Sequence, residues 1–138
     1  MKQDEIEHFL DEMNDAFYAG DTSRLMSYFC LPLVVYSVAG VVVMREQEEF
    51  LMMATSYHQA LQAKSVVDRR MTILSLDEPL NNRIRVTVRI VDLNDEGTPV
   101  TGSTVRYFLV ANPGGFAVEM LEYIEAPLPI SDIEQIIH

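Results

Sequence analysis

Three side chains in this sequence have the chemistry to move a proton or to hold a polar ligand: Tyr57, His58 and Tyr107. An imidazole titrates near neutral pH, so His58 could serve as a general base or a general acid. Both tyrosines lie among apolar residues, where a buried ring still needs a partner for its hydroxyl. These residues suit a site for an apolar molecule that carries a carbonyl. They are equally consistent with a partly exposed helical histidine and two ordinary core tyrosines.

Other common kinds of chemistry lack their residues. The spacing of His8, His58 and His138 fits no metal-binding pattern, and Cys30 is the single cysteine, so it has no partner for an internal disulfide. The glycine pair at residues 114–115 follows a proline in a turn and does not open a helix, so it is no phosphate loop. The sequence therefore predicts neither a metal nor a cofactor.

Length and charge limit the class of protein. A chain of 138 residues with 49% hydrophobic side chains fits one folded domain spanning residues 1–138. The formal net charge of −11 would repel a phosphate backbone and an anionic membrane surface, so neither nucleic acid nor membrane is an expected partner. The N-terminal residues are acidic and lack an apolar signal core, which favours the cytoplasm.

Hydrophobic periodicity predicts three helices. Apolar residues recur at steps of three and four over residues 4–19, and Gly20 is expected to end that helix. Asp21 offers an N-cap for a short helix over residues 22–29, before Pro32 blocks its continuation. Residues 46–64 form the third and longest predicted helix. The first and third apolar faces comprise Ile6, Phe9, Leu10, Met13 and Phe17, and Phe50, Met53, Ala54, Tyr57 and Leu61.

The rest of the chain is rich in strand-forming residues. Residues 33–44 are rich in valine, a β-branched residue, and are interrupted at Ala39 and Gly40, which predicts a short hairpin. Four further strands are expected at residues 65–75, 83–93, 100–111 and 116–125, separated by turns at 77–79, 94–97 and 112–115. A short helix is expected in the tail at residues 129–138. This order predicts an α+β domain with all helices on one side of one antiparallel sheet.

The strand at residues 83–93 has two unlike faces. Aliphatic side chains at 84, 86, 88 and 90 alternate with a polar row that contains Arg83, Arg85, Thr87 and Arg89. The aliphatic face should lie beneath the helices. The arginine row would meet either solvent or a second subunit, and the last strand supplies carboxylates to pair with it: Glu119, Glu122 and Glu125.

The order of the elements and the corner Phe17-Tyr18-Ala19-Gly20-Asp21 resemble the nuclear transport factor 2-like superfamily. That superfamily includes ketosteroid isomerases, SnoaL-like cyclases, scytalone dehydratase-like enzymes and many non-catalytic binding domains. The resemblance implies a cystatin-like α+β cone, with a pocket between the helices and the concave face of the sheet. It also implies a bacterial protein that forms a homodimer through the sheet.

Ketosteroid isomerase chemistry needs a carboxylate base and hydrogen-bond donors to an enolate. Aligned from the Gly20-Asp21 corner, this sequence has Ser37 at the position of the base and Met13 at that of a tyrosine donor. Tyr107 falls at the position of an acidic donor and is the one residue of the three that could still donate. The sequence therefore argues against that isomerase activity.

The leading hypothesis is a protein that binds a small hydrophobic molecule in the cone. An alternative is a SnoaL-like cyclase or a dehydratase-type enzyme that uses His58 with a tyrosine on a hydrophobic carbonyl substrate. A third is a homodimeric interaction module built on the arginine face. The candidate pocket residues are Met13, Phe17, Ser37, Tyr57, His58 and Tyr107.

Overall fold

The structure is a computed structural model that describes residues 2–38 and 40–125. In these residues two helices precede a hairpin of two short strands, and a third helix precedes four long strands. The elements are α1 (Lys2–Tyr18), α2 (Thr22–Met26), β1 (Phe29–Ser37), β2 (Gly40–Met44), α3 (Gln47–Ala63), β3 (Asp68–Leu80), β4 (Arg83–Leu93), β5 (Pro99–Asn112) and β6 (Gly115–Glu125).

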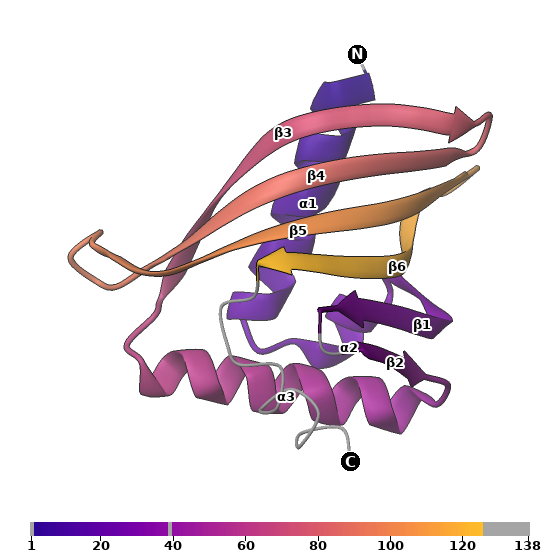
Figure 1. Ribbon diagram of the computed structural model, residues 1–138. Helices are drawn as coiled ribbons and strands as arrows, with labels where there is room; N and C mark the ends of the chain where they lie inside the picture. The colour runs from indigo at the N-terminus through magenta and orange to yellow at the C-terminus, as the bar shows by residue number, and fades with distance from the viewer. Residues whose placement is uncertain (1, 39, 126–138) are drawn as a thin grey trace.

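The described strands form one curved sheet in the order β2-β1-β6-β5-β4-β3. Neighbouring strands are antiparallel except for β1 and β6, which are parallel because α3 and the strands after it separate them along the chain. Figure 1 shows the long strands curving across α1, while α3 runs beside the short strands β1 and β2. The helices and the sheet are thus arranged as the predicted α+β order requires.

The helix ends follow local rules. Gly20 adopts a positive φ of 71°, a conformation that costs glycine little, and α1 ends just before it. The Asp21 carboxylate accepts a hydrogen bond from the backbone N–H of Arg24 at 3.1 Å, which confirms it as the N-cap of α2. At the start of α3, Glu49 accepts hydrogen bonds from the backbone N–H groups of Arg45 and Glu46. No helix among the described residues is long and apolar enough to cross a membrane.

The core lies between the helices and one face of the sheet, which we call the inner face. The predicted alternation in β4 is confirmed, because its four aliphatic side chains are all buried against this core. Full burial of one such side chain contributes about 1.5–3 kcal/mol relative to leaving it in water. From the helices, Ile6 and Leu10 of α1 and Phe50 of α3 complete the same core.

Two predicted boundaries are wrong. The helix expected to reach residue 29 ends at Met26, because Phe29 already pairs with Val118 in the sheet. The turn expected at residues 77–79 is part of β3, which pairs with β4 as far as Leu80 and places the turn at residues 81–82. Pairing with β4 overrides the local turn signal in this segment. The helix expected at residues 129–138 lies outside the described residues.

Candidate functional site

A cavity of about 90 Å³ lies between α1, α3 and the inner face of the sheet. For scale, an apolar cavity of roughly 150 Å³ is large enough to bind benzene. Several lining side chains, among them Asn14, Phe17 and Met53, are only partly buried, so the cavity is not sealed by buried residues alone. Its apolar lining comprises Leu10, Met13, Phe17, Leu25, Phe29, Phe50, Met53, Ala54, Met71, Ile90, Val105 and Leu121.

The structure places four of the six predicted site residues around this cavity: Met13, Phe17, Tyr57 and Tyr107. Met13 and Phe17 are four residues apart on α1, so both lie on the face that meets the sheet. Tyr57 comes from the apolar face of α3. Tyr107 comes from β5, where its register partners are Val86 and Leu121 on the inner face.

The other two predicted residues do not line the cavity. Ser37 lies at the end of β1, where its hydroxyl donates to the carbonyl of Gly40 across the hairpin at 3.3 Å. His58 is half-buried on α3, and its ring packs edge-on against the ring of Phe17 with centroids 5.4 Å apart. Tyr57 and His58 are consecutive residues of α3, so their side chains leave the helix about 100° apart.

A buried ion pair closes the polar end of the cavity. Arg69 of β3 and Asp92 of β4 are register partners on the inner face, and Arg69 Nε donates to Asp92 Oδ1 at 2.9 Å. The Asp92 carboxylate also accepts hydrogen bonds from the hydroxyls of Tyr18 and Thr101, each at 3.2 Å. The carboxylate is therefore held by three donors. Its side chain is 0% exposed, and that of Arg69 is 10% exposed.

Arg69 keeps hydrogen-bonding capacity that this pair does not use. Its guanidinium lies 5.2 Å from the ring centroid of Phe17 and 5.6 Å from that of Tyr18, so two aromatic faces hold it in place. Its buried Nη2 has no hydrogen-bond partner within the described chain, although Arg69 lines the cavity. Burial by itself lowers the pKa of a guanidinium, but Tyr57 and Asp92 outweigh burial, and the pKa of Arg69 lies above its ordinary value. Arg69 therefore remains a cation.

Three tyrosines share the cavity with this cation: Tyr57, Tyr107 and Tyr123. Burial raises the pKa of each above its ordinary value, and the charge of Arg69 offsets part of that rise. The hydroxyls therefore stay protonated and able to donate across the physiological pH range. Within residues 2–38 and 40–125, the hydroxyls of Tyr107 and Tyr123 form no direct hydrogen bond to another side chain.

Two further polar residues line the cavity. Asn14 follows Met13 on α1, and its buried Oδ1 has no hydrogen-bond partner among the described residues. Ser103 of β5 is 1% exposed and lies opposite Ile90 in the register. A buried polar atom without a partner costs about 1–3 kcal/mol, so such atoms commonly indicate a missing ligand or water.

Sequence reasoning missed Arg69, Asp92, Asn14 and Tyr123, although strand and helix periodicity contained a signal for each. The alternation that places Ile90 on the buried face of β4 also places Asp92 there, and a buried carboxylate requires a partner. In the same way, Asn14 shares the helix face of Leu10 and Phe17. The partner of Asp92 could not be found, because it depends on the β3–β4 register, and the predicted β3 had different ends.

The described lining of the cavity contains neither of the side-chain types that most often serve as a general base near neutral pH. No histidine and no carboxylate belongs to its described lining, since Asp92 lies behind Arg69 and outside the lining. No group of three His, Cys, Asp or Glu side chains in the described chain could hold a metal ion. The cavity has apolar walls, one cation and several hydroxyl donors. This combination is typical of sites for small molecules.

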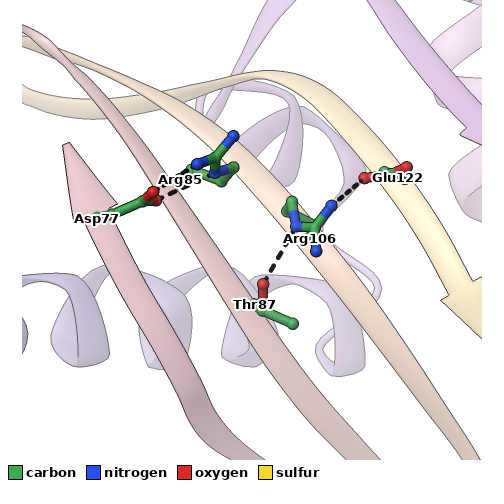
Figure 2. A network of polar contacts seen from close by, with 5 residues as sticks. All are labelled: Asp77, Arg85, Thr87, Arg106 and Glu122. Carbon is green, nitrogen blue, oxygen red and sulfur yellow. Dashed lines mark hydrogen bonds and ion pairs between the residues drawn. The ribbon is translucent and has the colours of Figure 1, made fainter. Parts of the chain in front are cut away.

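The opposite, outer face of the sheet carries the arginine row, and its charges are paired within the chain. Arg83 contacts Glu119 at 2.7 Å and Arg89 contacts Glu125 at 3.2 Å, which confirms the predicted pairing with the last strand. Figure 2 shows the centre of this network: Arg85 with Asp77, and Arg106 between Thr87 and Glu122.

Comparison with known proteins identifies the family. Residues 4–121 match the family described as "NTF2-like protein (DUF6841)". The chain belongs to this NTF2-like family. No curated protein is similar enough in sequence to count as a relative. The match covers α1 to β6, so the predicted membership of the nuclear transport factor 2-like superfamily is confirmed.

Solved structures show the same NTF2-like fold. An NTF2-like protein of unknown function from Shewanella oneidensis MR-1 is 18% identical, with a TM-score of 0.65 over 89% of this chain and 98% of its own. An NTF2-like protein with a cystatin-like fold from Novosphingobium aromaticivorans is 13% identical, with a TM-score of 0.66 over 99% and 88%. A domain of unknown function with a cystatin-like fold from Nostoc punctiforme is 14% identical, with a TM-score of 0.64 over 96% and 82%. At these identities the likeness shows the fold alone.

Proposed function

We propose that this NTF2-like protein binds a small hydrophobic molecule in the cavity between α1, α3 and the inner face of the sheet. The observation that carries the proposal is an apolar cavity whose polar groups keep unused hydrogen-bonding capacity. The buried guanidinium nitrogen of Arg69 and the buried amide oxygen of Asn14 have no partner within the described chain, so both are available to a polar group of a ligand.

The size of the cavity sets the size of the ligand. The volume of about 90 Å³ is smaller than the roughly 150 Å³ of a cavity that binds benzene, so a ligand of that size requires the lining to adjust. Flexible side chains such as Met13, Met53 and Met71 line it, and methionine adapts its shape at low cost. A ligand somewhat larger than the present volume therefore remains compatible with the proposal.

The test is an NMR titration of the protein with small neutral probes, namely toluene, benzamide and hexanamide. We expect saturable shifts of backbone amides in α1, α3 and the inner-face residues of β4 and β5. Shifts confined to other parts of the chain, or no saturable binding by any probe, would contradict the proposal. Native mass spectrometry of the freshly purified protein would show in parallel any ligand retained from the cell.

Ala54→Leu is the variant designed to fill the cavity, because Ala54 is buried on α3 and lines it. The added volume should abolish probe binding and cost about 1–3 kcal/mol of stability through overpacking. Ala60→Leu is the matched control, since Ala60 lies on the same helix, is half-buried and does not line the cavity. Equal loss of binding in both variants would show that the probes do not occupy the cavity.

We also propose that two copies associate through the outer face of the sheet. Tyr36 and Val41 are register partners on this face, and they are 41% and 52% exposed. Half-buried Phe108 and Met120 continue the apolar surface toward β5 and β6. The same face carries arginines on β4 and glutamates on β6, so a two-fold related copy can meet it with opposite charges.

Sedimentation velocity over a range of protein concentrations tests this association. We expect a dimer that Val41→Lys converts to a monomer, because the variant places a charge within the apolar surface. Met52→Lys, at an exposed position on α3, is the control and should leave the dimer unchanged. A wild-type monomer at high concentration would contradict the proposal.

A further inference from the structure

We propose that the ligand of the cavity is a compact apolar carboxylic acid, bound as its carboxylate anion by Arg69. This inference rests on the proposed function, because it names the class of molecule that the same cavity binds. Its basis is the chemistry of the polar end, where one cation and several hydroxyl groups meet.

The polar end of the cavity is richer in donors than in acceptors. Arg69 Nη2 is a charged donor without a partner within the described chain, and Tyr57, Tyr107 and Tyr123 bring three protonated hydroxyls. An isolated ketone or ether oxygen would accept from two of these groups at most. A carboxylate has two oxygens and about four lone-pair sites, so it can accept from the guanidinium and from neighbouring hydroxyls at once.

The charge of the lining favours an anion. Among the described residues that line the cavity, Arg69 is the one charged residue, and none is a carboxylate. The Asp92 carboxylate is turned to Arg69 Nε, Tyr18 and Thr101, which leaves Arg69 Nη2 as the unpaired edge of the guanidinium. Hydrogen bonds between ionised partners are about twice as strong as neutral ones, so the charged form of the acid gains most at this position.

The remaining walls define the other half of the ligand. Beyond the polar end the lining consists of aliphatic, methionine and phenylalanine side chains, which offer no partner to a second polar group. The exceptions are Ser103 and Asn14, and the Oδ1 of Asn14, which has no partner among the described residues, could accept from a hydroxyl of the ligand. A short-chain or single-ring monocarboxylic acid therefore fits the cavity better than a diacid, a sugar or a nucleotide.

The experiment compares matched acids and amides at pH 7, where the acids are ionised. Benzoate is titrated against benzamide, and hexanoate against hexanamide, with dissociation constants from NMR titration in a buffer free of carboxylates. Each pair has the same shape and number of non-hydrogen atoms, so the ratio of the two constants reports the exchange of a neutral amide NH2 for a charged acceptor oxygen. We expect each acid to bind at least about tenfold more tightly than its amide, the lower end for a charge-assisted pair.

Two variants connect the preference to the guanidinium. Arg69→Met alone would leave Asp92 buried without its cation, and the protein could then fail to fold. The double variant Arg69→Met with Asp92→Asn removes both charges and leaves an amide to accept from Tyr18 and Thr101. In the double variant we expect the amides to bind as before and the acid-to-amide ratio to fall to about 1.

The outcomes separate this inference from the proposed function. Equal binding of acid and amide to the wild-type protein overturns the carboxylate inference and leaves the proposed function intact. If neither acids nor amides bind, the proposed function fails and the inference fails with it. An acid preference that persists in the double variant also overturns the inference, because another group then holds the anion.

Discussion

The two faces of the sheet use arginine in different ways. On the outer face Arg83, Arg85, Arg89 and Arg106 lie partly in solvent, and each contacts a carboxylate of another strand. On the inner face Arg69 is buried against the rings of Phe17 and Tyr18. Its Nε donates to Asp92, and its Nη2 has no partner within the described chain. The arginines of the outer face are thus paired with carboxylates, whereas Arg69 Nη2 in the interior has no hydrogen-bond partner within the described chain.

This difference indicates where the molecule has chemistry to offer. Exposed ion pairs contribute a median of about 0–1 kcal/mol, because water competes for both partners. A buried charge loses its hydration, so each N–H of Arg69 without an acceptor lowers the stability of the folded protein. A ligand that accepts from it removes this penalty. The outer row therefore suits a surface that is kept soluble or joined to a copy, and the inner pair suits a binding site.

The largest expected effect comes from breaking the inner pair. We expect Arg69→Met to lower the free energy of unfolding by about 3–5 kcal/mol, because Asp92 stays buried without its cation. Urea denaturation measures this loss. The double variant with Asp92→Asn should recover most of it, and a single variant costing under about 1 kcal/mol would show that the inner pair behaves like a surface pair.

Alkaline pH should weaken the inner side next. Burial raises the pKa of Tyr18 to about 12, against 10 in the unfolded chain, and raises those of the three cavity tyrosines. A raised folded-state pKa means that the folded protein holds the proton more tightly. The contribution of the Tyr18 proton to stability is therefore complete below pH 10 and is lost as the pH rises through 12.

Urea unfolding at pH 8 and at pH 11 measures this loss, and tyrosinate absorbance reports the ionisation. The native protein should ionise its tyrosines at higher pH than the urea-unfolded protein. Tyr18→Phe should make stability less dependent on pH between 10 and 12. Coincident titration of native and unfolded protein would contradict the burial of these hydroxyls.

A smaller effect is expected from a single cavity hydroxyl. Tyr107→Phe should weaken benzoate binding about tenfold or more, since one hydrogen bond to a charged group is worth about 1.5–3 kcal/mol. It should barely change stability, because this hydroxyl forms no direct hydrogen bond to another described side chain. Tyr36→Phe, on the exposed outer face, is the control for NMR titration with benzoate and should leave the dissociation constant unchanged.

The smallest effect should come from the outer row. Arg106→Gln removes a 2.7 Å contact with Glu122, but the two side chains are 34% and 38% exposed to solvent. We expect a loss of less than about 1 kcal/mol in urea denaturation, and less still at high salt. A loss as large as that of Arg69→Met would remove the contrast between the faces.

The fold could be predicted from the sequence further than the site could. Alternation in β4 and the Gly20-Asp21 corner are local signals, and both predicted the right structure. The predicted ends of α2 and β3 were wrong because pairing with other strands decides them: Phe29 pairs with β6, and residues 77–80 pair with β4. Four lining residues could be predicted because each lies on the buried side of a single helix or strand: Met13, Phe17, Tyr57 and Tyr107. The Arg69–Asp92 pair joins two strands whose register the sequence does not specify, and His58 illustrates that a reactive residue type alone does not locate a cavity.

The most direct test of the contrast between the faces is a crystal structure of the protein with benzoate. The carboxylate should lie within about 3 Å of Arg69 Nη2, with the ring against Phe17 and the apolar wall. Benzoate bound at the arginines of the outer face, or in the cavity with its carboxylate away from Arg69, would contradict the account.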